Sequence, residues 1–181
     1  MRLGLIWLLI SIVLSTSSPV CSGGGDPEDE LKAATVLSFL RYSEWPDTPA
    51  TPITVGVFGR NAMLETLRIR LKDKSIDGHA VKVVELRPGW DGLGCDVIYI
   101  GAGRSADIKQ ALDAVHSAHV LTIGESNRFL ELGGAINLLL VYGRISFEFS
   151  RNALEQSGFS ISSKLLRFGQ VRQVGKVRPP A

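Results

Sequence analysis

The chain has 181 residues, of which 45% are hydrophobic and 21% are charged, and its formal net charge is +2. This composition is typical of a folded globular protein and excludes a disordered or low-complexity chain. A net charge this small also argues against nucleic acid as a partner.

The N-terminus has the layout of a signal peptide. One positive charge, Arg2, precedes an apolar run from Leu3 to Leu14, which is shorter than the roughly 20 residues that a membrane-spanning helix needs. We expect residues 1–24 to be removed on export and residues 25–170 to form one domain. An uncleaved membrane anchor and a lipoprotein acylated at Cys21 are the alternatives, although Val20 is larger than the residue a lipobox prefers there.

Helical and strand patterns alternate through the first two thirds of the mature chain. Apolar spacing and strand composition predict helices at 28–43, 61–73 and 105–119 and strands at 53–59, 79–87, 95–101 and 120–125. This alternation indicates a mainly parallel sheet with helices on both faces, which is a three-layer α/β sandwich.

The last third of the chain breaks the alternation. Residues 135–150 form two strand-like runs that meet at Tyr142-Gly143, which predicts an antiparallel hairpin at the C-terminal end of the sheet. A short helix is expected next, capped by Ser150 or Asn152 and ended by Gly158, followed by a last helix over 160–168. Residues 171–181 have several basic residues and no acidic ones, and we expect a flexible tail.

Two glycine-bearing turns are candidate ligand sites. Gly101, Gly103 and Ala106 match the dinucleotide-binding pattern G-x-G-x-x-A, and Glu125 stands where a ribose-binding acid would be expected. The motif lies in the middle of the sheet order, so we interpret its glycines as a tight strand-to-helix turn and expect no cofactor. A small ligand would instead use the crevice at the carboxyl ends of the strands, near Arg60 and Arg104.

No catalytic or metal-binding motif is evident. The sequence has no nucleophile elbow, paired carboxylates or HExxH arrangement, so we expect no enzyme. Asp113, His116 and His119 share a helical spacing, but a third strong ligand is not apparent and we expect no metal. Cys95 is the single cysteine after the expected signal peptide, which leaves no partner for an internal disulfide, and burial is its expected role.

Several segments in one order resemble the YfiR family. They are KAATVLSFLRYSEWP near the start of the domain, CDVIYIG in the middle, Gly133-Gly134, the strand RISFEF at 144–149 and the run ISSKLL at 161–166. The resemblance covers about 140 residues. Members of the family often pair the cysteine that corresponds to Cys95 with another one, so redox control through an internal disulfide is not expected here.

The resemblance implies a periplasmic α/β domain without catalysis. It implies a signalling subunit that binds the sensor domain of an inner-membrane GGDEF protein, or of a histidine kinase, and represses its output. In the family an outer-membrane lipoprotein can sequester such a subunit, so that protein is a second candidate partner, and a homodimer is left open. A periplasmic small-molecule-binding protein is the alternative function.

The residues expected to contact a partner lie within these family-like segments. Arg144 and Glu148 alternate with the phenylalanines of their strand and are expected on its other face, while Lys164 and Arg167 are expected on the exposed face of the last helix. Trp45, at the end of the first helix, is either a core residue or an exposed binding anchor. A solvated ion pair of little energetic consequence is the alternative for Glu148.

Overall fold

The computed structural model describes residues 26–46, 52–59, 61–90, 94–116, 118–165 and 171–174. The helices in this part of the chain are α1 (Pro27–Tyr42), α2 (Asn61–Leu71), α3 (Ser105–Ala114) and α4 (Arg151–Ser157). The strands are β1 (Ser43–Glu44), β2 (Ile53–Phe58), β3 (Ser75–Ile76), β4 (His79–Leu86), β5 (Val97–Ile100), β6 (Leu121–Gly124), β7 (Ile136–Val141), β8 (Arg144–Ser150), β9 (Ser160–Ile161) and β10 (Val171–Val174).

The main sheet has the strand order β10-β8-β7-β6-β5-β2-β4-β3. Its five central neighbours, from β4 through β2, β5 and β6 to β7, are parallel. Antiparallel hairpins end the parallel part, with β8 beside β7 and β3 beside β4. The predicted parallel sheet with an antiparallel C-terminal hairpin is therefore confirmed.

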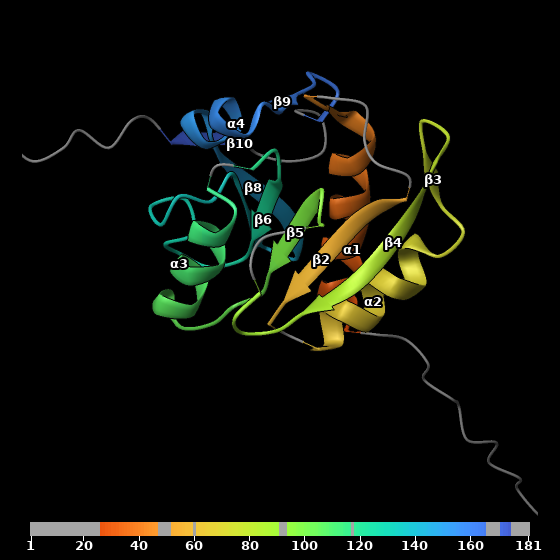
Figure 1. Cartoon of the computed structure of the whole chain (residues 1–181), viewed down its shortest axis with the longest axis horizontal. Coiled ribbons are helices and arrows are strands. Elements are labelled where there is room, and N and C mark those ends of the chain that lie inside the picture. Colours follow the sequence, from red (N-terminus) through yellow and green to blue (C-terminus); the bar gives the residue numbers. More distant parts are fainter. Residues whose placement is uncertain are drawn as a thin grey trace, which may run out of the picture.

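Helices cover both faces of this sheet (Figure 1). Along β5, Val97 and Tyr99 belong to a core formed with α1 and α2, whereas Ile98 and Ile100 belong to a second core formed with α3. Successive side chains of a strand point to opposite faces, so a strand with four buried residues in a row must be covered on both sides. The three-layer prediction is confirmed.

The caps of α1 and α4 follow from their sequence. At the start of α1, the Asp26 carboxylate accepts a hydrogen bond from the backbone N–H of Glu28 at 2.9 Å, and Pro27 occupies the first turn. At α4, the Ser150 hydroxyl accepts from the N–H of Ala153 at 3.3 Å, and Gly158 ends the helix in the left-handed conformation with φ of +78°. The predicted Ser150 cap and Gly158 stop are confirmed.

The predictions after Gly158 need correction. A helix over 160–168 is wrong for the described residues, because Ser160 and Ile161 form β9, which pairs antiparallel with β1 in a separate two-stranded sheet. The Ser160 hydroxyl also donates a hydrogen bond to the Glu44 carboxylate. These tertiary contacts override the helical spacing of the segment. Residues 166–168 lie outside the described residues.

Two further boundaries differ from expectation. Helix α3 ends at Ala114 and not at His119, because Val115 and His116 form a turn and Ala118 and His119 a bend before β6 begins. Residues 171–174, the start of the expected flexible tail, form β10 and pair parallel with β8.

Among the described residues, no helix is long and apolar enough to cross a membrane. The expected signal peptide lies outside the described residues.

Candidate functional site

The predicted ligand crevice lies where the winding of the sheet reverses. From β2 the chain passes through α2 to β4 on one side, and from β5 it passes through α3 to β6 on the other side. In open α/β sheets such a switch point is the usual ligand site. Here β2 and β5 stay paired to their ends: the N–H of Gly101 donates to the carbonyl of Phe58 at 2.8 Å, and a Cβ on Gly59 would lie at an ordinary contact distance of 3.5 Å from the Gly101 nitrogen.

A buried ion pair occupies the neighbouring strand end. The Lys32 ammonium, on α1, donates a hydrogen bond to the Glu125 carboxylate just after β6, and these side chains are only 4% and 5% exposed. Glu125 also accepts a hydrogen bond from the N–H of Ala102 at 3.0 Å. The acid that the dinucleotide-binding pattern would assign to a ribose is thus paired within the protein.

The charge of Lys32 is stabilised by its partners. Burial alone would lower the pKa of its ammonium, and burial is the largest single influence. The hydrogen bonds and charges of Glu125 and Glu28 together outweigh burial, so the pKa of Lys32 is raised above its usual value. Lys32 therefore carries its charge in the folded protein and holds α1 to the crevice.

Of the two arginines predicted for the crevice, the structure describes Arg104, and Arg60 lies outside the described residues. The Arg104 side chain is 84% exposed, and its guanidinium donates two hydrogen bonds to Asp107, at 2.9 and 3.0 Å. This pair is local to the first turn of α3, and the structure does not bring Arg104 together with Glu125.

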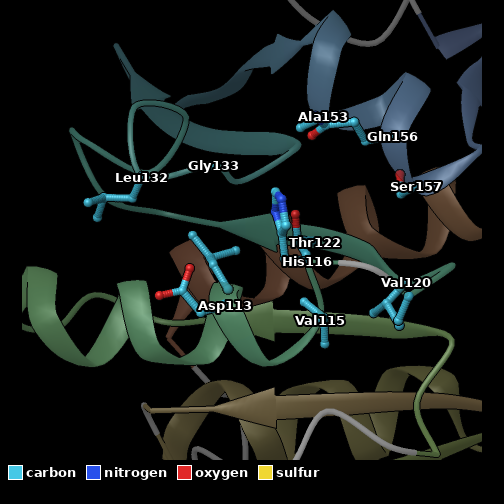
Figure 2. Close-up of a pocket in the computed structure, with 12 residues that line it drawn as sticks. Asp113, Val115, His116, Val120, Thr122, Leu132, Gly133, Ala153, Gln156 and Ser157 are labelled. Atoms are coloured by element: carbon cyan, nitrogen blue, oxygen red, sulfur yellow. The ribbon is translucent and has the colours of Figure 1, made fainter.

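A small cavity lies beside the end of α3 (Figure 2). Asp113 lines it from α3, His116 from the turn after α3, and Gln156 and Ser157 from α4, with the imidazole of His116 between the two helices. Its volume of about 40 Å³ suits a few water molecules and no metabolite. In the part of the chain that the structure describes, no three His, Cys, Asp or Glu side chains are grouped to hold a metal ion.

A much larger apolar groove, of about 900 Å³, runs between α1 and the β7–β8 hairpin. We call it the hairpin groove. The described residues that line it are Leu31, Ala34, Thr35, Ser38, Phe39, Val141, Tyr142, Gly143, Arg144, Ile145, Ser146, Phe147 and Leu165. Arg144 is the one ionisable side chain with a full charge at neutral pH in this set. The groove is therefore apolar with a positive charge at its rim.

The strand pattern explains the apolar wall of the groove. Leu138 opposes Phe147 and Leu140 opposes Ile145 across the hairpin, so these four side chains share one face of the sheet. The inner pair is buried, and Phe147 packs edge-on against Phe39 of α1 with ring centroids 5.0 Å apart. The outer pair extends beyond the part of the sheet that α1 covers, and Leu140 is 44% exposed.

The structure separates the predicted partner-binding residues. Arg144 is exposed on the groove, and Lys164 is exposed next to Leu165, which lines it. Glu148 is half-buried farther along β8, and Arg167 lies outside the described residues. Trp45 is half-buried: its indole packs edge-on against Phe159 at 5.3 Å and donates to the carbonyl of Leu40 at 3.3 Å, so packing is its role in this structure.

Other groove residues were not predicted from the sequence. Among the described residues, exposed large hydrophobic side chains occur at Leu31, Ile69, Leu140, Val141 and Tyr142, and all but Ile69 lie on α1 or the hairpin beside the groove. The run LLLVY at 138–142 could have predicted this exposed apolar surface. A strand with one face in water normally alternates apolar and polar residues, and this strand stays apolar to its end.

Exposed apolar grooves of this kind are typical of surfaces that bind another molecule. The family model described as YfiR/HmsC-like matches residues 29–170. The chain belongs to the YfiR/HmsC-like family.

A solved structure from Vibrio cholerae O1 biovar El Tor strain N16961, titled a conserved domain protein, has a similar fold. Its TM-score is 0.50 at 16% identity, and the match covers 67% of this chain and 54% of that one. The present chain thus spans about half the length of that protein. No curated protein matches the sequence.

Proposed function

We propose that this protein is an exported signalling subunit that binds the sensor domain of an inner-membrane diguanylate cyclase, or of a histidine kinase, and represses its output. The hairpin groove carries the proposal, because exposed apolar side chains gathered on one surface, here Leu31, Val141 and Tyr142, are typical of a protein-interaction site. Family membership supplies the signalling context. Removal of residues 1–24 on export to the periplasm belongs to the same proposal, as does sequestration by an outer-membrane lipoprotein.

Affinity capture followed by reconstitution tests this function. The tagged mature protein is recovered from gently solubilised envelopes, and the sensor domain of any co-purifying cyclase or kinase is then produced in soluble form. We expect saturable binding in isothermal titration calorimetry and a rise in cellular cyclic di-GMP when the gene is deleted. Absence of binding to every sensor domain recovered, together with unchanged cyclic di-GMP on deletion, would overturn the proposal.

A small-molecule receptor is the second candidate. It rests on the switch point between β2 and β5. The buried Lys32–Glu125 pair already uses the acidic side chain that a ligand would contact at this end of the sheet. The crevice therefore supports this function less well than the groove supports partner binding.

A further inference from the structure

The hairpin groove lies where the sheet topology omits a helix. In a doubly wound sheet, each parallel strand is normally followed by a helix that packs back on one face. The last parallel strand, β7, instead turns at Tyr142-Gly143 into the antiparallel β8. Helix α4 follows the other end of β8, after Ser150. Among the described helices, none packs beside α1 over the turn end of the hairpin.

The position that the described helices leave open has the dimensions of a short helix. Along α1 the groove extends from Leu31 to Ser38, which is two helical turns. A helix with its side chains is about 10 Å across and rises about 1.5 Å per residue, so two turns fill roughly the 900 Å³ that the groove encloses. Addition of a strand is a poorer fit, because β10 already pairs with the outer edge of β8.

The lining determines the chemistry of a complementary helix. Leu31, Phe39, Ile145 and Leu165 form an apolar floor and walls, which suit apolar side chains spaced three and four residues apart. Arg144 is exposed at the rim of the groove. Because it alternates with Ile145, it belongs to the other face of the strand and reaches the groove at its edge, which suits an acidic residue near one end of the incoming helix.

Tyr142 gives an independent indication that this surface binds something. Both two-residue hairpin turns in the described chain need positive φ at their two central residues. The β3–β4 turn uses Asp77-Gly78, a favoured pair, whereas the β7–β8 turn places Tyr142 at φ of +50° with its side chain fully exposed. A tyrosine in this conformation destabilises the turn and buries nothing in the isolated protein, which points to a role in contact with a partner.

We propose that the hairpin groove receives an amphipathic helix of about two turns from the sensor domain of the membrane partner. The helix takes the open position beside α1, its apolar face contacts Leu31 and Ile145, an acidic residue faces Arg144, and Tyr142 packs over its outer side. This inference rests on the proposed function, since it assigns the surface through which the partner is bound.

Paired substitutions test the surface. Leu31→Ser, in the groove, and Ile69→Ser, on α2 away from it, each remove an exposed aliphatic side chain, 44% and 71% exposed respectively. With the reconstituted sensor domain, we expect Leu31→Ser and Arg144→Glu to weaken binding by tenfold or more and Ile69→Ser to change it less than twofold. Circular dichroism confirms that each variant is folded.

Cross-linking tests the shape of the occupant. Benzophenone attached to cysteines introduced at Thr35 and Ser38 should mark residues of the sensor domain that recur every three or four positions. Cross-links to every second residue of the sensor domain would indicate a bound strand and would overturn the helix inference. Equal affinity of the Leu31, Arg144 and Ile69 variants would overturn the groove as the binding surface. In both cases the proposed function stands. If the wild-type protein does not bind the sensor domain at all, both fail.

Discussion

Replacing Tyr142 with asparagine should make the protein more stable and a weaker binder. Tyr142 has φ of +50° and a side chain that is fully exposed, so the substitution sacrifices no burial in the isolated protein. A left-handed backbone costs an ordinary L-residue roughly 1–2 kcal/mol, and asparagine tolerates it far better. We therefore expect a gain of about 1 kcal/mol, which raises Tm by roughly 2–4 °C for a domain of this size.

Two measurements on the same sample check this prediction. Urea unfolding gives the free energy of unfolding, and calorimetric titration with the sensor domain gives the affinity, which we expect to fall by about tenfold for an aromatic contact. Asp77→Tyr is the matched control: it places tyrosine in the other two-residue turn and should cost about 1 kcal/mol without changing affinity. If Tyr142→Asn leaves both stability and affinity unchanged, the argument from strain is refuted.

Three further outcomes are expected from the core. Lys32→Ala should lower the free energy of unfolding by about 3 kcal/mol in urea, because it removes the buried ammonium that balances the charge of the Glu125 carboxylate. In the wild type, the raised pKa of Lys32 predicts stability that is fully present below pH 10.5 and is lost as the pH rises through the higher pKa of the folded state. Burial, aided by Asp96, raises the pKa of Cys95 to about 11 from 9.0, so its reaction with a disulfide reagent at pH 8 should be about 100-fold slower in the folded than in the unfolded protein. Gly134→Ala should destabilise by about 1–3 kcal/mol on thermal melting, since its Cβ would lie 2.1 Å from the Phe129 ring.

The parallel part of the fold was predictable because long, periodic segments carry strong signals. The apolar run from Val97 to Ile100 predicted a strand that is covered on both faces, and these four residues are buried. The alternation around Phe147 predicted which face of its strand points to the core. The two-residue strands β1 and β9 have no period to detect, and their pairing brings together residues more than 110 positions apart. Only tertiary contacts could show that 160–161 pair with 43–44.

The candidate site was predictable in part for a related reason. Arg144 was found because it alternates with core phenylalanines on a clear strand. The groove exists because α1 leaves the turn end of the β7–β8 hairpin uncovered. Leu31 could not be identified as exposed, because the apolar residues of α1 occupy more than one face of the helix. Exposure of Leu31 and Leu140 follows from the relative placement of helix and hairpin, which local sequence does not encode.

The Lys32–Glu125 pair has a consequence for how the groove meets its partner. It ties the first half of α1 to the loops after β5 and β6, and the Asp26 cap holds the start of the same helix. Sliding or tilting α1 would expose or separate this buried charge pair, which is energetically costly. The position of α1, which forms one wall of the groove, is therefore fixed in the isolated protein. In the proposed complex, the entropy cost of ordering then falls mainly on the incoming helix rather than on α1.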